Sequence, residues 1–443
     1  MAQLFRADQT LVRDPVSGTA TFQTDVAVLE DGGDIVAIGP AAELAKKHPG
    51  ATPVSLAGKA LLPGTVSTHT HAFQYLVRGF GDDLEFFEWR SKGIYAYSLK
   101  LDAKGIYVGA LLAFAELLRH GTTTAVDFFY LNDQANENAE AVIQAARDLG
   151  MRVVLARCLY DWDGAPMKYR ETVPVARRNT EALVDKYRND RMAQVHVAPH
   201  SPHGASGEMI RAAAEIAKAK RVPLHIHVAE GQYEVKETLE KHGKTPMRWL
   251  ETLGVLDGKC LAVHGVWLDD GELDLMKERG AALSYNPSSN MFLGDGVTPI
   301  PKWLARGIPV TLGVDGGCSN NQASIFGEMR MCALLQKVTA LDARAVTAEQ
   351  VFDMGTVNAE HALGLPIGSI AAGKRADFVT LDLGDLSLLP VQQLRKNVVY
   401  AQSQKAVRDV FVDGRQVVKN GKLTTVTEEQ VADQVQRLTA DWR

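Results

Sequence analysis

Cysteine is scarce in this sequence of 443 residues. The four cysteines are Cys158, Cys260, Cys318 and Cys332, and no two of them have CxxC spacing. A secreted scaffold held together by disulfides is therefore not expected, and the reducing cytoplasm is the predicted location.

Long apolar runs and an excess of positive charge are also missing. No apolar run is long enough to span a bilayer, and the first residues, MAQLFRADQTLVRD, lack the apolar segment of a signal peptide. The formal net charge is −5, and no basic stripe is visible. We therefore expect neither a membrane nor a nucleic acid as a partner.

A glycine-rich dinucleotide fingerprint is the third absence, and it bears on the fold. The composition is that of an ordinary globular protein. A chain of 443 residues is longer than one hydrophobic core usually supports, so we expect a large domain and a smaller one. Short runs rich in β-branched residues alternate about eight times with helical patterns, which is typical of a (β/α)₈ barrel. The alternative is a doubly wound open sheet, which usually carries the missing fingerprint after its first strand.

Both ends of the chain have a different texture, with short apolar runs joined by turns that contain glycine. Such runs occur in DVAVLEDGGDIVAIGP near the start and in VRDVFVDGRQVVKNGKL near the end. We predict a small β-sandwich domain formed by both termini (1–60 plus 367–425), a metal-binding α/β barrel (61–366) and a C-terminal helix (426–443).

Side chains that can bind a metal recur where the predicted barrel strands end, and barrel enzymes carry their chemistry at this face. His69 and His71 end one strand, in which alternate residues point to the same side. His227 and Asp315 end two later strands. Three imidazoles and one carboxylate suit one Zn²⁺ or Fe²⁺ ion with a position left for water. The alternative is a set of core histidines whose hydrogen bonds are satisfied within the protein.

His225 lies two residues before His227 and competes with it for the role of ligand. Glu230 favours His227, because a carboxylate just beyond the strand end could reach both substrate and water at the metal. Such a carboxylate can accept a proton from water and return it to a leaving group. We therefore predict Glu230 as the proton shuttle. His264 is predicted to hydrogen-bond the attacking water or stabilise an oxyanion, the alternative being a structural histidine.

Eight segments of the chain resemble the metal-dependent amidohydrolase superfamily, and more narrowly its aminohydrolase branch of deaminases and triazine hydrolases. They are LLPGTVSTHTH (61–71), ELLRHGTTTAVDF (116–128), APHSPHGAS (198–206), HVAE (227–230), VHG (263–265), NPSSNMFLGDG (286–296), LGVDGGCSNN (312–321) and GSIAAGKRADFV (368–379). Together they extend over nearly the whole chain in the order that the family has.

The resemblance implies a distorted (β/α)₈ TIM barrel with a β-sandwich from both termini. It also implies one divalent ion, Zn²⁺ before Fe²⁺, on the four ligands named above. His200 stands at the end of the fourth strand, where binuclear relatives carry a carboxylated lysine, which favours a mononuclear site. By the same resemblance, Glu230 protonates a ring nitrogen while His264 and Asp315 activate water, and ammonia leaves the amine-bearing carbon.

The substrate is less well defined by the sequence. Gln74 matches a glutamine of guanine, oxopurine and pterin deaminases, whereas segments 76–89 and 319–337 resemble deaminases of methylthioadenosine and S-adenosylhomocysteine. His200 matches a substrate contact of the family. Tyr285 replaces a histidine that those relatives usually have before the NPSSN motif, so we expect it to contact substrate and alter specificity, or else to fill space.

Trp89 is expected to stack on a flat heterocyclic substrate, the alternative being simple packing. The predicted function is a hydrolytic deaminase of a purine, pterin or triazine. Alternatives are a methylthioadenosine or S-adenosylhomocysteine deaminase, a hydrolase of amidine, guanylurea-like or chloro-triazine substrates, and a non-catalytic barrel that binds partners. The last is disfavoured because every metal ligand and the shuttle carboxylate are present. Members of the family that the sequence resembles are often homo-oligomers, so self-association is expected.

Overall fold

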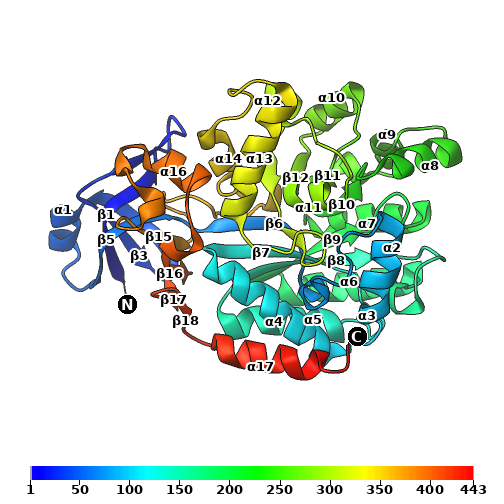
Figure 1. Ribbon diagram of the computed structural model, residues 1–443, viewed down its shortest axis with the longest axis horizontal. Coiled ribbons are helices and arrows are strands. Elements are labelled where there is room, and N and C mark those ends of the chain that lie inside the picture. Colours follow the sequence, from blue (N-terminus) through cyan, green and yellow to red (C-terminus); the bar gives the residue numbers. More distant parts are fainter. Residues whose placement is uncertain (1, 443) are drawn as a thin grey trace.

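The middle of the chain forms a parallel sheet in the order β13-β12-β11-β10-β9-β8-β7-β6-β14 (Figure 1). The computed structural model describes residues 2–442. The strands are β6 (Thr65–His71), β7 (Thr122–Phe129), β8 (Arg152–Leu159), β9 (Ala193–Pro199), β10 (Leu224–Val228), β11 (Cys260–His264), β12 (Ala282–Tyr285), β13 (Val310–Leu312) and β14 (Asp315–Gly316). β13 pairs with β12 and the directly following β14 pairs with β6, so together they act as the eighth strand and curl the sheet into a barrel.

Helices cover the outside of this barrel and explain why its strands are so apolar. All seven residues of β6 and all eight of β7 are buried, because side chains of the barrel interior fill one face and helices cover the other. The helices that connect successive strands are α4 (Ala103–Arg119), α5 (Glu137–Leu149), α6 (Val173–Tyr187), α7 (Gly207–Lys220), α8 (Gln232–His242), α9 (Pro246–Thr252), α10 (Asp270–Glu278), α11 (Pro287–Phe292) and α12 (Ile300–Ala305). The predicted alternation of strands and helices, and with it the barrel fold, is confirmed.

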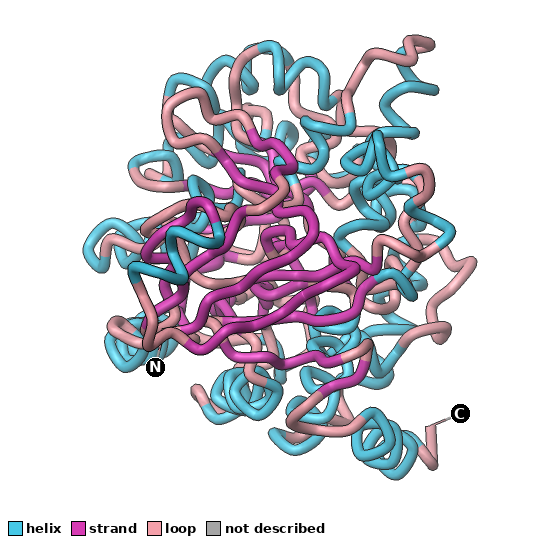
Figure 2. The backbone as a smooth tube through the Cα atoms, turned by 90° about the vertical axis from the view of Figure 1, so that its left-hand side faces the viewer, coloured by secondary structure: helices cyan, strands magenta, loops and turns pink. Residues whose placement is uncertain are grey.

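A second sheet of mixed direction lies beside the barrel and is built from both termini, as predicted (Figure 1); its strands face the viewer in Figure 2. Its order is β18-β17-β16-β15-β5-β1-β3-β4, with β2 paired to β1. The strands are β1 (Gln3–Arg13), β2 (Ala20–Gln23), β3 (Val26–Asp31), β4 (Asp34–Pro40), β5 (Thr52–Pro63), β15 (Phe378–Asp382), β16 (Val407–Val412), β17 (Arg415–Lys419) and β18 (Lys422–Leu423). Phe5 packs edge-on against Phe378 and Phe411, with ring centroids 5.2 and 5.1 Å apart, so residues from both ends share one core. The predicted boundary at residue 60 falls within β5, and the domain limits stay a prediction.

Further helices complete the chain after the barrel closes. They are α13 (Ile325–Ala340), α14 (Ala348–Met354), α15 (Asn358–Leu363), α16 (Leu394–Tyr400) and α17 (Glu428–Thr439). The short elements are α1 (Ala41–Lys47), α2 (Phe86–Glu88), α3 (Ala96–Ser98), the π-helix η2 (Trp89–Tyr95), and the 3₁₀ turns η1 (Ala72–Val77), η3 (Met167–Tyr169), η4 (Val255–Asp257), η5 (Leu386–Leu388), η6 (Val391–Gln393) and η7 (Gln404–Ala406). α17 runs along α4 (Figure 1), and Arg119 on α4 forms an ion pair of 3.0 Å with Glu428. None of the helices described in residues 2–442 has the length and apolar character needed to cross a membrane.

Two glycines allow η1 to pack closely against the turn that follows β14. A Cβ atom on Gly316 would lie 1.8 Å from Oε1 of Gln74, and one on Gly317 would lie 2.5 Å from the backbone Cα of Tyr75. The close approach holds Gln74 beside the end of the eighth strand.

Replacing Gly317 with alanine is therefore expected to destabilise the fold by about 1–3 kcal/mol, because backbone atoms must move to admit the methyl group. The midpoint of urea unfolding measures the effect. Gly258 is the matched control, since among residues 2–442 no atom beyond its own and those of its two chain neighbours lies within 4 Å of a Cβ atom there, and its φ of −138° suits alanine. Equal midpoints for the two variants would show that η1 tolerates displacement.

Candidate metal centre and active site

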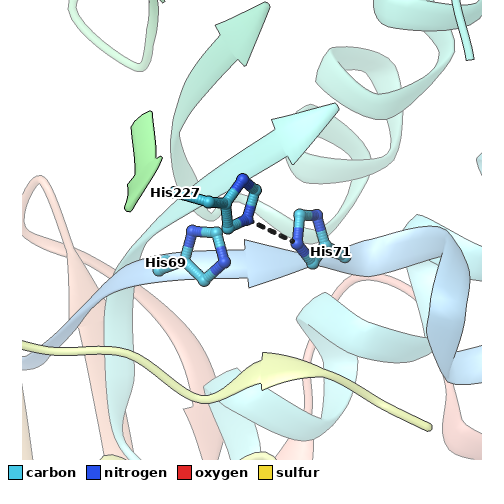
Figure 3. A group of neighbouring side chains, drawn as sticks. All are labelled: His69, His71 and His227. Carbon is cyan, nitrogen blue, oxygen red and sulfur yellow. Dashed lines mark hydrogen bonds between the residues drawn. The ribbon is translucent and has the colours of Figure 1, made fainter. Parts of the chain in front are cut away.

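Three histidines meet at the carboxyl ends of the barrel strands (Figure 3). His69 and His71 lie on β6 and His227 on β10, and one ring nitrogen of each lies within 4.8 Å of the others. A second group of the same size contains His69, His264 and Asp315. The structure thus brings together the four ligands predicted from the sequence, on strands that are far apart in the chain.

The hydrogen bonds of the imidazoles fit a bound cation. Nδ1 of His71 lies 2.6 Å from the carbonyl oxygen of Phe128, and Nδ1 of His227 lies 2.8 Å from that of His200. Each Nδ1 therefore carries the proton, and the two bare Nε2 atoms face each other at 3.3 Å. Neither ring nitrogen of buried His69 has a hydrogen-bond partner within the described residues. Lone pairs that converge in this way are what a divalent metal ion requires.

Asp315 supplies the anionic member of the group. Its Oδ1 lies 3.4 Å from Nε2 of His69 and 3.6 Å from Nε2 of His71. Burial alone would raise the pKa of this carboxyl, but His69, His264 and His71 together lower the pKa well below its usual range. The pKa of His71 falls to about 3, mainly because the ring is buried. These directions favour an ionised Asp315 carboxylate beside a neutral His71 imidazole.

Backbone strain is concentrated where these side chains leave their strands. His264 has a φ of +74°, Asp315 a φ of +62°, and Ala229, which precedes Glu230, a φ of +51°. Residues other than glycine adopt this left-handed region at a cost of order 1–3 kcal/mol each. Each of these turns directs a polar side chain toward the same point, which favours a functional rather than a structural explanation for the group.

Glu230 lies beside this group in the opposite ionisation state. Its Oε1 is 3.5 Å from Nε2 of His264, and the side chain is buried. Burial first, and then the nearby Asp295 and Asp315, raise the pKa of Glu230 well above its usual value, which favours the protonated form. Two neighbouring carboxyls whose pKa values are pushed apart are the usual arrangement of an acid and a base in one active site.

His264 is oriented by two buried amides. Nδ2 of Asn290 lies 3.0 Å and Nδ2 of Asn286 3.3 Å from its Nδ1. Asn290 also donates to Asp295 at 3.1 Å, which fixes the orientation of its amide. Because Nδ1 accepts, the ring proton belongs on Nε2, which points toward Glu230 and Asp315. Burial lowers the pKa of His264 to about 4, so the ring is a neutral donor.

A cavity of about 600 Å³, including its open mouth, adjoins the candidate metal centre. Gln74, Trp89 and His200, all predicted substrate contacts, line it. The other lining residues are His71, Phe86, Arg90, Ile94, Tyr95, Tyr130, Tyr160, Tyr169, His203, His227, Glu230, His264, Leu293 and Asp315. Aromatic walls of this kind suit a flat heterocycle.

The polar atoms of Gln74 and Trp89 are already engaged within the protein. Nε2 of Gln74 donates to the hydroxyl of Tyr130, and Oε1 accepts from Sγ of Cys318 at 3.2 Å. The indole of Trp89 donates to the carbonyl oxygen of Cys318 at 2.8 Å. Trp89 therefore offers a ligand mainly its ring surface. Part of the hydrogen-bonding capacity of the Gln74 amide, which an oxopurine or pterin would need, is already used within the protein.

Tyr285 does not reach the cavity. Its side chain is fully buried, and its hydroxyl accepts a hydrogen bond of 3.4 Å from Gln336 on α13. The next residue, Asn286, takes the inward position beside His264. The placement does not support Tyr285 as a substrate contact and agrees with the alternative that it fills space.

The sequence reasoning missed several residues at this site. Asn290 and Asp295 lie in NPSSNMFLGDG, one of the segments that carry the family resemblance, but the motif alone indicated no role for them. Tyr130 directly follows β7, so the rule that chemistry gathers at strand ends could have found it; Tyr160, which follows β8, stands at a predicted strand end but was given no role. Arg90 lies in an irregular segment after β6, and no sequence signal pointed to it.

Comparisons with known proteins agree with the geometry. The sequence model of the Amidohydrolase family matches residues 60–417. A 5-methylthioadenosine/S-adenosylhomocysteine deaminase of Syntrophobacter fumaroxidans is 37% identical over 93% of this chain and 91% of its own. A 5'-deoxyadenosine deaminase of Methanosphaera stadtmanae is 36% identical over 84% and 85%. The solved structure of an adenosine deaminase from Xanthomonas campestris with bound zinc superposes with a TM-score of 0.91 at 27% identity, over 99% and 98%.

Proposed function

The chain belongs to the amidohydrolase family, and from this premise we propose that it is a hydrolytic deaminase that releases ammonia from the adenine ring of a nucleoside. One observation carries the proposal. Glu230, whose pKa is raised, and Asp315, whose pKa is lowered, both lie next to Nε2 of His264, at 3.5 and 3.8 Å, in one aromatic-walled cavity. Such a pair can give a proton to a ring nitrogen while a water molecule is activated a few ångströms away.

The family is metal-dependent, and we propose a single Zn²⁺ ion held by His69, His71, His227 and Asp315. Support comes from the ring nitrogens that carry no proton and face each other, and from the zinc that is bound in the Xanthomonas structure. When bound there, a divalent ion lowers the pKa of water from 15.7 to about 7–9 and so supplies a nucleophile at neutral pH. His200 belongs to neither of the two groups of converging ligand atoms, and its Nδ1 is engaged by Ser201 at 2.9 Å.

The residues of the chain divide the proton transfers between them. Glu230 holds a proton and gives it to the ring nitrogen next to the amine-bearing carbon, which makes that carbon electrophilic. Asp315 accepts a hydrogen bond from water, and the Nε2–H of His264 stabilises negative charge that develops on the attacking oxygen. Glu230, now ionised, accepts the proton that water loses and passes it to the amine. As ammonia leaves, the hydroxyl that remains on the carbon gives its proton back to Glu230, which leaves a C=O group and restores the protonated carboxyl.

The substrate class rests on two further observations. The relatives that cover most of this chain at 37% and 36% identity are named as deaminases of adenosine derivatives. One N–H and one lone pair of the Gln74 amide are used by Tyr130 and Cys318, which disfavours the oxopurine and pterin substrates that a fully free amide would recognise.

An ammonia-release assay tests the proposal. We expect the zinc-loaded protein to release ammonia from 5'-deoxyadenosine, methylthioadenosine or S-adenosylhomocysteine with a kcat/KM of at least about 10⁴ M⁻¹s⁻¹, the range of ordinary enzymes. Guanine, pterins, melamine, guanylurea and a chloro-triazine serve as comparison substrates, and chloride and alkylamine release are measured in parallel. Faster turnover of any comparison substrate than of every adenine nucleoside would contradict the assignment.

A further inference from the structure

We propose that Arg90 forms an anion-binding subsite in the cavity and that the preferred substrate carries a carboxylate away from its reacting carbon. The inference rests on the proposed function, because it names which adenine nucleosides the site selects. Arg90 lines the cavity, and nothing in the proposed deamination uses it.

Arg90 is held in the π-helix η2, between α2 and α3. A π-helix places residues five apart on one face, and the guanidinium of Arg90 lies 5.7 Å from the ring centre of Tyr95. It also lies 4.8 Å from the ring of Trp162 and 5.2 Å from that of Phe87. Three rings from two parts of the chain therefore fix the cation at one wall of the cavity.

Aromatic rings hold the guanidinium by its charge but leave its N–H groups unused. A ring face attracts the cation electrostatically, whereas the five donors of arginine point outward in the guanidinium plane. The buried Nε of Arg90 has no hydrogen-bond partner, and no residue among 2–442 accepts from its other nitrogens. The planar fork is thus free for a bidentate acceptor.

The charge of Arg90 is not neutralised by any acidic side chain in the part of the chain that the structure describes. Within residues 2–442, no carboxylate lies within 4.0 Å of Arg90. The nearest acid in sequence, Glu88, is bonded to Lys92 at 2.7 Å, and Asp161 accepts from Ser206 at 2.6 Å. Of the cavity acids, Asp315 is surrounded by imidazoles and Glu230 favours its protonated form. A partly buried charge without a partner is costly, so an anion on the ligand fits it.

A carboxylate matches this subsite better than a phosphate does. One guanidinium compensates one negative charge, and its fork fits the two oxygens of a carboxylate. A phosphate monoester carries about −1.5 to −2 charges at pH 7 and would leave charge uncompensated among the rings of Tyr95, Tyr160 and Tyr169. The same donor geometry can bind either group, and the experiment separates them.

The test uses pairs of substrates in which one member carries an anionic group that the other lacks; in the long pair this member also carries an ammonium group. The short pair is 5'-deoxyadenosine and adenosine-5'-carboxylate, the long pair is methylthioadenosine and S-adenosylhomocysteine, and AMP supplies the phosphate. For the substrate that carries the carboxylate in at least one pair, we expect Arg90→Gln to lower kcat/KM by about 10- to 100-fold, mainly by raising KM. The neutral partner should change by less than about threefold, and Arg90→Lys should be intermediate because it keeps the charge but loses the fork. Arg178→Gln, an exposed arginine on α6, is the control and should change neither.

Binding is measured separately by calorimetry in a Glu230→Gln background, so that ligands are not consumed. Binding of a carboxylate ligand that weakens with Arg90→Gln supports the subsite even if no ammonia is released, a result that would overturn only the proposed function. Equal losses on neutral and charged ligands would assign Arg90 to packing and overturn the inference. A larger loss on AMP than on both carboxylates, or no Arg90-dependent binding at all, would overturn it as well.

Discussion

Glu230→Gln is expected to lower kcat by about 10³- to 10⁴-fold while leaving the metal content unchanged. Glutamine has nearly the same shape and can still hydrogen-bond near His264, but at neutral pH it has no proton to transfer. General acid–base catalysis by one group contributes about 10²- to 10⁴-fold, and the upper part of this range applies because Glu230 is proposed to serve in both proton transfers. Steady-state ammonia release and metal analysis of the same preparation measure the two quantities.

Asp295→Asn is the matched control, because Asp295 is the neighbouring buried carboxyl and does not line the cavity. After burial, the charge of Asp295 is the largest cause that raises the pKa of Glu230. Removing it lowers that pKa, so the alkaline limb of the kcat/KM profile, where Glu230 loses its proton, should move to lower pH. We expect turnover at the optimum within about tenfold of the wild type. A Glu230→Gln variant with near-normal kcat would remove Glu230 from the mechanism.

The barrel and the metal group were predictable because both depend on short-range periodicity. Alternate residues of a strand share a side, so the HxH spacing at His69 and His71 places both rings inward once a strand is recognised. Parallel strands of a barrel end on one face, which brings His227 and Asp315 to the same place although long stretches of chain separate them. These arguments need only the positions of the strand ends.

The orientation of residues in loops and at the last position of a strand was not predictable in the same way. Tyr285 ends β12 and turns toward Gln336 on α13, while Asn286 takes the inward place beside His264. Arg90 owes its place to an irregular π-helix and to Trp162, which lies about seventy residues later in the chain. The path of such segments is decided by tertiary packing, which propensities and spacing do not report.

The long segment after β6 also explains why specificity is harder to infer than reaction type. The proposed metal ligands leave strands, whose direction is fixed by the sheet, whereas Trp89, Arg90 and Tyr95 all lie on η2. Strands give the reaction its geometry, and the loop between β6 and α4 gives the cavity much of its wall. Changes confined to η2 should therefore alter which substrate is used without altering the chemistry.

Two histidines on β10 offer the sharpest test of the metal ligands, because they lie two residues apart and are both buried. His227→Gln is expected to lose stoichiometric metal and to lower kcat/KM by about 10³-fold or more, since the ion supplies several kcal/mol of transition-state stabilisation. His225→Gln should keep the metal. Nε2 of His225 is bonded to Nδ1 of His196 at 2.8 Å, deeper in the barrel, so its loss costs folding stability of about 1–3 kcal/mol instead.

Elemental analysis and urea unfolding with and without a chelator separate the two effects. A metal that binds the folded state alone adds stability as its concentration rises above Kd. Added Zn²⁺ should therefore raise the urea unfolding midpoint of the wild type and of His225→Gln. The midpoint of His227→Gln should change little. The reverse pattern, with metal lost from His225→Gln and kept by His227→Gln, would exchange the roles of the two histidines. Metal kept by both variants would mean that neither His225 nor His227 alone is required to hold the ion.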